Sequence, residues 1–203
     1  MVEMLVVVAL LVFSAVVFLS VPDRNARQRT QQIMCVNNLR QIVPAILLWS
    51  TFHDDKFMME TSVTNGGTME LVANGLAYLQ FRVISNELFG PQIMYCPADD
   101  TRAPAKSFGN GDFGNTNLSY FLNVDATKGD IILVGDRNIS LNHVPVSPGL
   151  VVIPPNGPVS WTAERHKGGG NVGLVDGSVQ QLSLAPHHGL DAPGVITNRW
   201  VVP

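Results

Sequence analysis

The feature that most constrains this chain is its first 21 residues, MVEMLVVVALLVFSAVVFLSV. Residues 4–21 are eighteen residues without a charge, and only Ser14 and Ser20 among them are polar. As a helix they would be about 27 Å long, close to the roughly 30 Å hydrocarbon thickness of a bilayer. The one charge in this run is Glu3, and the nearest basic residue is Arg24. A carboxylate among apolar groups needs a cation, so we expect a neighbouring copy of the chain to supply one.

Composition limits what the remaining residues can form. A chain of 203 residues is long enough for one domain of about 150 residues behind an N-terminal helix. Charged residues make up 14% of the chain and the net charge is −3, which argues against a general nucleic-acid-binding protein. With 18 glycines, 13 prolines and 46% hydrophobic residues, the sequence favours a loop-rich, β-containing domain over disorder.

A second helical pattern follows the apolar run. Apolar residues recur every three to four positions between residues 33 and 52, which is typical of a helix with one covered face. We therefore predict one long helix that continues to residue 53, with kinks at Pro22 and Pro44, because proline cannot donate to the helical hydrogen-bond ladder. The predicted organisation is an apolar transmembrane or filament-core segment at residues 1–22 and a globular domain at 23–203, with 23–53 as the second half of the helix.

The predicted strands are short and lie in the second half of the chain. Residues 119–123, 131–134 and 150–153 are strand candidates, and residues 68–83 favour a helix or a pair of short helices. Two alternating runs around Asp176-Gly177 predict a hairpin with a two-residue type I′ turn. Residues 191–203 are predicted to add an edge segment.

The start of the chain resembles that of type IV pilins and type II secretion pseudopilins. The resemblance rests on VEMLVVVALL, Pro22 and the helical continuation into CVNNLRQI at residues 35–42. Cys96-Pro97-Ala98-Asp99 and the pattern of His166, nine residues and Asp176-Gly177 also match a large bacterial group of pilin-like proteins. In mature family members two further residues normally precede the position that matches Met1.

The resemblance implies a fold, an assembly mechanism and a location. The implied fold class is α+β and pilin-like: a long kinked N-terminal α-helix packed on a small antiparallel β-sheet, with many loops. Glu3 matches the glutamate that is thought to pair with the N-terminal amine of an adjacent subunit, which places Met1 and Glu3 at the assembly contact.

The implied function is that of a structural subunit, not an enzyme. Copies would polymerise into a type IV pilus or type II secretion pseudopilus with the help of a prepilin peptidase and assembly machinery. Before assembly they would lie in the inner membrane, and after assembly they would form an extracellular or periplasmic filament. No nucleic-acid partner is expected. The alternative left open is a membrane-anchored extracytoplasmic binding protein that does not polymerise.

Cys35 and Cys96 are the only cysteines. Because the globular part should lie outside the cytoplasm, where disulfides persist, we predict that they form one. Cys35 lies one step from the apolar stripe of the helix, and the proline after Cys96 keeps its segment extended. Two buried free thiols are the alternative.

No motif predicts catalysis or a resident cofactor. The five histidines are scattered and no zinc motif occurs, so we interpret His166, Asp176 and Gly177 as structural and expect no metal. Calcium stays open as an alternative, since two loops are rich in oxygen ligands but lack the calcium-loop pattern. Their candidate ligands are Asn110, Asp112, Asn115, Asn117, Asp99 and Asp100. Acidic pairs such as Asp99-Asp100 are otherwise expected to be solvated turns.

Overall fold

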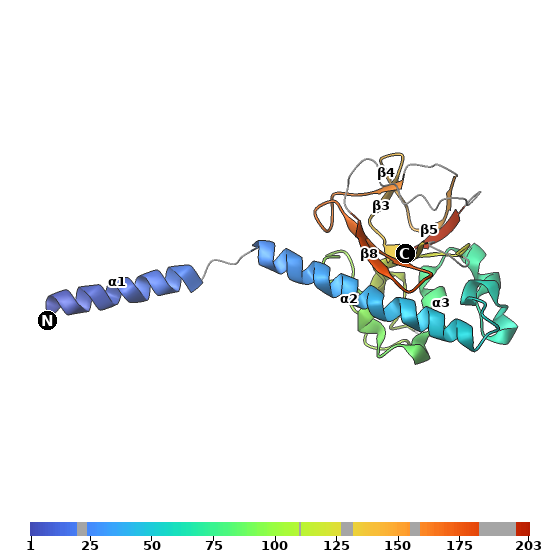
Figure 1. Cartoon of the computed structure of the whole chain (residues 1–203), viewed down its shortest axis with the longest axis horizontal. Helices are drawn as coiled ribbons and strands as arrows, with labels where there is room; N and C mark the ends of the chain where they lie inside the picture. The colour runs from blue at the N-terminus through green and yellow to red at the C-terminus, as the bar shows by residue number, and fades with distance from the viewer. Residues whose placement is uncertain (20–23, 110, 127–131, 155–158, 183–197) are drawn as a thin grey trace. The chain divides into compact units, whose positions relative to one another are not determined.

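The computed structural model describes residues 1–19, 24–109, 111–126, 132–154, 159–182 and 198–203. These residues form two compact units, Met1–Thr30 and Gln31–Pro203. Figure 1 draws the path of the chain through both units.

The N-terminal region contains two helices where one long kinked helix was predicted. Helix α1 covers Val2–Leu19 and helix α2 covers Arg24–Thr51. Residues 20–23 lie outside the described residues, and the predicted kink at Pro22 falls there. Helix α2 continues through Pro44 as one uninterrupted element (Figure 1). Among the described residues, no helix combines the length and the apolarity needed to cross a membrane.

The second unit is mainly β, with two antiparallel sheets, so the predicted fold of a long kinked helix on one small sheet is wrong. The larger sheet has six strands in the order β5 (Gly149–Ile153), β9 (Asn198–Val202), β1 (Tyr120–Asn123), β2 (Ile132–Asp136), β7 (Gly170–Leu174) and β8 (Val179–Leu182). The smaller sheet has three in the order β4 (Val144–Pro145), β3 (Ile139–Leu141) and β6 (Val159–Trp161).

Short helices fill the chain between α2 and the first strand. The predicted helix at residues 68–83 is a pair, η3 (Met69–Asn74) and α3 (Ala77–Arg82). Gly75 separates them because its φ of 65° ends the first helix in the left-handed region. The other single turns are η1 (Met58–Glu60), η2 (Val63–Asn65), η4 (Ser85–Glu87), η5 (Pro91–Met94) and η6 (Asn115–Asn117).

The central strands β1, β2 and β7 of the larger sheet are buried on both faces, which explains their mainly apolar sequences. Along β1, Tyr120 and Leu122 belong to the core that includes α2, while Phe121 belongs to a second core on the opposite face. Phe121 stacks on Trp200 there, with ring centroids 4.3 Å apart. The buried face of α2 consists of Cys35, Leu39, Ile42, Val43, Ala45, Ile46 and Trp49.

The predicted hairpin is confirmed as β7–β8, but its turn type and the predicted place of the C-terminal strand are wrong. The C-terminal strand β9 lies between β5 and β1, inside the sheet and not at its edge. In the β7–β8 hairpin, Gly177 N donates to Leu174 O over 3.1 Å and Leu174 N donates to Ser178 O over 2.9 Å, so the loop has three residues and ends on Gly177 with φ 92°. A turn with two left-handed residues, as in type I′, occurs instead between β3 and β4, at Asn142 and His143.

Candidate functional site

The candidate site is a buried polar cluster that surrounds the one disulfide. Cys35 on the buried face of α2 is joined to Cys96, which follows η5; the Cα atoms are 5.0 Å apart, and the predicted pairing is confirmed. Both cysteines are at most 1% exposed. The bridge spans 61 residues, which corresponds to about 4 kcal/mol in the chain-entropy treatment of disulfides.

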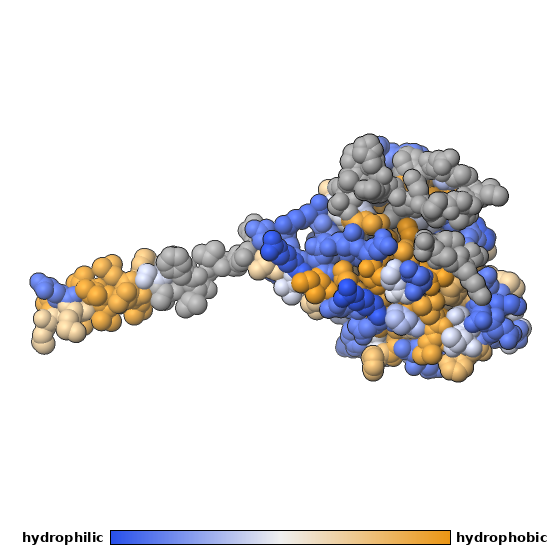
Figure 2. Space-filling model, in the orientation of Figure 1, coloured by the Kyte–Doolittle hydropathy of each residue, from blue (hydrophilic) through white to orange (hydrophobic). Residues whose placement is uncertain are grey.

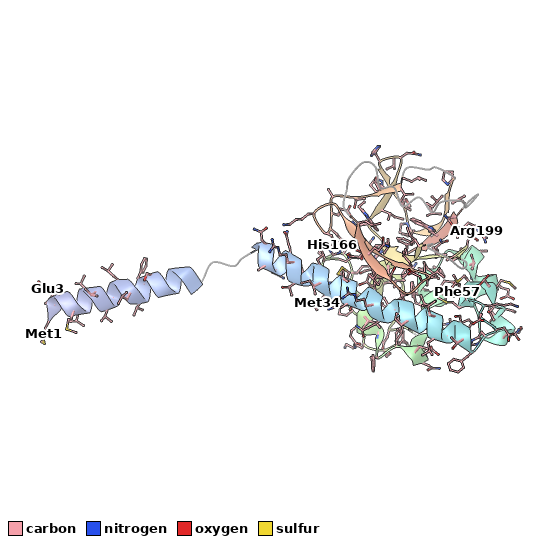
Figure 3. The ribbon with its side chains drawn as sticks, viewed as in Figure 1. Met1, Glu3, Met34, Phe57, His166 and Arg199 are labelled. Atoms are coloured by element: carbon pink, nitrogen blue, oxygen red, sulfur yellow. A yellow bond between two sulfur atoms is a disulfide. The ribbon has the colours of Figure 1, made fainter. Side chains whose placement is uncertain are left out.

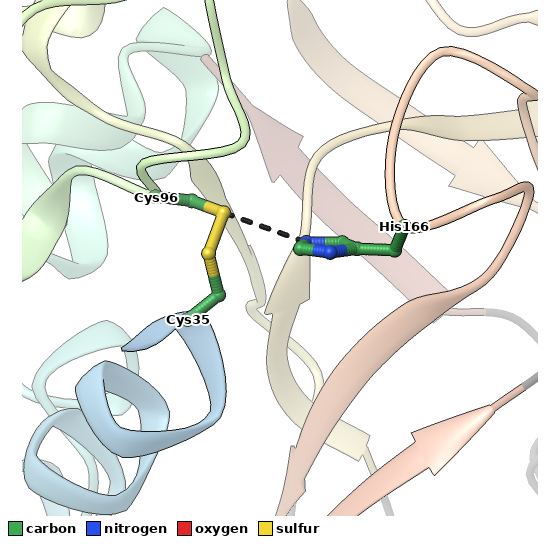
Figure 4. Close-up of side chains that lie close together, drawn as sticks. All are labelled: Cys35, Cys96 and His166. Atoms are coloured by element: carbon green, nitrogen blue, oxygen red, sulfur yellow. Dashed lines mark hydrogen bonds between the residues drawn. A yellow bond between two sulfur atoms is a disulfide. The ribbon is translucent and has the colours of Figure 1, made fainter. Parts of the chain in front are cut away.

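His166 lies against this disulfide. Its Nε2 atom lies 3.4 Å from Cys96 Sγ (Figure 4). The same atom is 3.3 Å from Asp136 Oδ2, and the His166 side chain is 1% exposed. The residue belongs to the loop between β6 and β7, where both His166 and Lys167 have positive φ angles, 49° and 58°. Such angles cost free energy in residues other than glycine, so the surrounding contacts hold this loop in place.

Asp136 ends β2 and contacts two elements. Its Oδ2 atom accepts hydrogen bonds from Asn171 N over 2.8 Å and from Asn171 Nδ2 over 2.7 Å, at the start of β7. Its Oδ1 atom is buried and has no hydrogen-bond donor among the described residues. Burial first, and the Asp136 charge second, raise the pKa of the nearby Tyr120 well above its usual range.

Asp99 pairs with two arginines and is completely buried. Arg137 Nε donates to its Oδ2 over 2.9 Å, and Arg165 Nη2 contacts its Oδ1 at 2.7 Å. Burial alone would raise the pKa of Asp99, but the Arg137 hydrogen bond and the Arg165 charge lower it below the usual value. The expectation of a solvated turn at Asp99 is therefore wrong.

The cluster is a buried network of charged and polar groups. Asp99 contacts Arg137 and Arg165, and Asp136 contacts His166. It joins α2, the segment after η5, the end of β2 and the loop before β7. Because its groups are largely shielded from solvent, its chemistry is that of a tertiary clamp and not of an exposed nucleophile.

The structure brings only some of the sequence-predicted residues together. His166, Cys35 and Cys96 meet in the cluster. Asp176 does not contact His166 through any hydrogen bond in the described residues; its Oδ1 accepts from Ser178 N over 2.8 Å within the hairpin. That bond is the main reason why the pKa of Asp176 is lowered.

Met1 and Glu3 lie in the other unit, at the start of α1, as Figure 3 shows. Glu3 is the single charged residue of α1, and in the described part of the chain it forms no ion pair. The apolar side chains from Met4 to Phe13 are exposed, and they appear as the hydrophobic surface of α1 in Figure 2.

Side-chain oxygens of the oxygen-rich loop at residues 110–117 accept hydrogen bonds from other groups of the chain. Asp112 accepts from Ser107 Oγ over 2.6 Å, Asn115 Oδ1 from Tyr78 N over 3.1 Å, and Asn117 Oδ1 from Gly114 N over 3.0 Å. Asn110 lies outside the described residues. Within the described ranges, the one group of three residues with metal-ligand geometry is Cys35, Cys96 and His166.

Comparison with known protein families, curated proteins and solved structures finds no match to this chain. The site must therefore be judged on its own residues. Sequence reasoning missed Asp136, Arg137, Arg165 and Asn171. For Asp136 and Arg137 the available signal was a charged pair at the end of an apolar run, ILVGDR at residues 132–137.

Proposed function

We propose that this chain is a structural subunit that polymerises through its N-terminal helix into an extracellular type IV pilus or a type II secretion pseudopilus. Its partners are further copies of itself, the prepilin peptidase and the assembly machinery. The proposal rests on α1 and not on the architecture of residues 31–203, which differs from the expected one.

One observation carries the proposal: α1 is apolar around its whole circumference, with exposed side chains at every position from Met4 to Phe13. A helix that is hydrophobic on all sides is stable only when another surface covers it on all sides. If the α1 helices of several copies pack together, each of them is covered on all sides. Glu3 then lies among Leu and Val side chains, where a carboxylate needs a cation from a neighbouring copy.

The second unit is consistent with assembly through α1, because its own core is complete without a second copy of the chain. The face of α2 that carries Leu39, Ile42 and Ile46 is completely buried within the unit, and the disulfide fixes α2 to the rest. Such a unit can remain folded whether or not α1 has found its partners.

The experiment compares Glu3→Ala with Asp100→Ala, which removes an exposed acid elsewhere. Filaments sheared from cells that express each full-length variant are counted by electron microscopy and identified with an antibody to the second unit. We expect Glu3→Ala to abolish or strongly reduce filaments, and Asp100→Ala to leave their number unchanged. Equal filament yield from both variants would exclude pairing at Glu3.

A chain that gives no filaments even as the wild type would contradict the proposal and favour the non-polymerising binding protein. Removal of residues 1–22 supplies a second test, since it deletes the apolar segment. We expect residues 23–203 to sediment as a monomer at all concentrations. An oligomer of this shortened chain would place the assembly contact outside α1.

A further inference from the structure

The geometry points to a second, reduced state of the chain in which Cys35, Cys96 and His166 bind a divalent cation of the zinc type. This inference is independent of the proposed filament function. The disulfide and the metal would be alternative occupants of one site, and the redox state of the two cysteines would select between them.

The first argument is the placement of the ligand atoms. The two Sγ atoms and a ring nitrogen of His166 all lie within 4.8 Å of one another. Tetrahedral zinc, with bonds of about 2.0–2.3 Å to nitrogen and sulfur, separates its ligand atoms by roughly 3.3–3.8 Å. Opening the disulfide allows the two sulfurs to reach that separation by side-chain rotation, while Nε2 of His166 already lies 3.4 Å from Cys96 Sγ (Figure 4).

The second argument is a buried carboxylate beside the site with unused hydrogen-bonding capacity. Asp136 is 1% exposed and its Oδ2 lies 3.3 Å from His166 Nε2. The Oδ1 atom of the same carboxylate is buried without a hydrogen-bond donor among the described residues. A buried acceptor in that condition is costly, and the charge of a cation bound by the neighbouring imidazole and thiolates would lower that cost. Thiolates and imidazole are established zinc ligands.

The third argument is charge. Reduction replaces the neutral disulfide by two thiolates, each with one negative charge, beside the buried carboxylate of Asp136. A divalent cation bound by the two thiolates cancels their charges, so the site keeps the net charge that it has with the disulfide. A monovalent cation would leave one uncompensated negative charge, and a trivalent one would leave a positive charge, which a buried site disfavours.

The chemistry balances in two steps. A dithiol reductant transfers two electrons and two protons to the Cys35–Cys96 disulfide, which becomes two thiols while the reductant forms its own disulfide. Zinc then binds the two thiolates, and the two thiol protons pass to solvent. In a reducing compartment the chain would hold the metal, and oxidation of the cysteines would release it.

The test uses Co²⁺ as a spectroscopic probe for the site in the full-length chain. Chain reduced with a phosphine and titrated with Co²⁺ should show thiolate-to-cobalt charge transfer and the intense visible bands of tetrahedral cobalt, saturating at one ion per chain. Zn²⁺ should displace the cobalt and erase the bands. The oxidised chain should show neither signal, and two protons should be released for each ion that the reduced chain binds.

His166→Asn and His143→Asn form a matched pair of variants. Both residues have positive φ angles, 49° and 65°, which asparagine tolerates well, and His143 is exposed in the β3–β4 turn. We expect His166→Asn to weaken cobalt binding at least tenfold and His143→Asn to leave it unchanged. Equal binding by the two variants, or binding by the oxidised chain, would overturn the site.

Loss of folding on reduction would not hide the answer. In that case the readout is near-ultraviolet circular dichroism of the reduced chain before and after Zn²⁺ is added. Recovery of the native spectrum at one ion per chain supports the site, because metal binding then supplies folding free energy. A spectrum that Zn²⁺ does not change, with no tetrahedral cobalt signal, excludes it.

Discussion

Two sets of Arg–Asp contacts in the second unit use the same chemistry in opposite surroundings. Asp99 is completely buried between Arg137 and Arg165, whereas Asp125 and Arg199 form a bidentate pair at the edge of β9, with contacts of 2.6–3.1 Å and side chains 24% and 49% exposed. The label on Arg199 in Figure 3 locates the exposed pair. Both sets of contacts have short distances. Only the Asp99 contacts are shielded from water.

This difference indicates which of the two sets of charged contacts the stability of the fold depends on. An exposed pair gains little over two hydrated ions, so its free energy is commonly below about 1 kcal/mol. Forming a buried ion pair is costly because both charges lose their water. Removing one partner leaves an uncompensated buried charge, which lowers the free energy of unfolding by about 3–5 kcal/mol. The Asp99 contacts should therefore be essential and the Asp125 contacts dispensable.

The largest expected effect comes from Asp99→Asn. The substitution keeps the size of the side chain but leaves Arg165, which is 3% exposed in its side chain, without its counter-charge. We expect a loss of about 3–5 kcal/mol in the free energy of unfolding. Urea unfolding with the disulfide intact measures it.

Asp125→Asn is the matched control for that substitution and should lose about 1 kcal/mol or less. Similar losses in both variants would show that burial does not distinguish the two sets of contacts.

A glycine substitution extends the comparison from charge to packing. A Cβ atom at Gly173 in β7 would lie 2.2 Å from Val43 Cγ2 on α2, whereas one at Gly114 would meet nothing within 4 Å. Since Val43 is buried and cannot retreat, we expect Gly173→Ala to lower the free energy of unfolding by about 1–3 kcal/mol. Gly114→Ala should change it far less in the same urea titration, and a stable Gly173→Ala variant would mean that β7 can move away from α2.

The sequence predicted the local part of this structure well and the long-range part poorly. The helical spacing around Cys35 and Leu39 and the apolar runs of β1, β2 and β5 reflect neighbours along the chain, so their elements were found. The place of β9 inside the sheet depends on pairing with residues about 50 and about 78 positions away, which no local pattern encodes.

The candidate site shows the same division. The disulfide could be predicted because Cys35 and Cys96 are the only cysteines. Asp99 was misread because an Asp-Asp pair after Cys-Pro-Ala has the composition of a solvated turn. Only the fold reveals that Arg137 and Arg165, 38 and 66 residues further on, enclose it. Burial and the choice of partner are properties of tertiary structure.

The pH dependence of stability gives a third test of the buried contacts. The pKa of Asp99 is lower in the folded chain than in the unfolded chain, so the unfolded state binds the proton more tightly. Its contribution is then complete above the unfolded pKa of about 3.9 and is lost as the pH falls through the folded pKa. We expect the free energy of unfolding to fall less steeply below about pH 4 in Asp99→Asn than in the wild type, as measured by urea titrations at several pH values.

The smallest effect is expected at the exposed pair, from Arg199→Met. Methionine keeps most of the aliphatic length of arginine, so the change isolates the charge and its hydrogen bonds. The hydrogen bonds to Asp125 raise the pKa of Arg199, but the Arg199 side chain is about half exposed and Asp125 regains water when the arginine is lost. Asp125 Oδ2 also keeps its bond from the backbone N–H of residue 199, over 2.7 Å, which holds the loop after β1 against β9.

We therefore expect Arg199→Met to lower the free energy of unfolding by less than about 1 kcal/mol. The difference from the wild type should shrink further in 1 M salt, where exposed charges are screened. Arg165→Met is the buried counterpart, and its larger cost should persist in the same salt. A salt-insensitive loss of several kcal/mol at Arg199 would show that this edge of the sheet, despite its exposure, depends on charge as strongly as the buried cluster does.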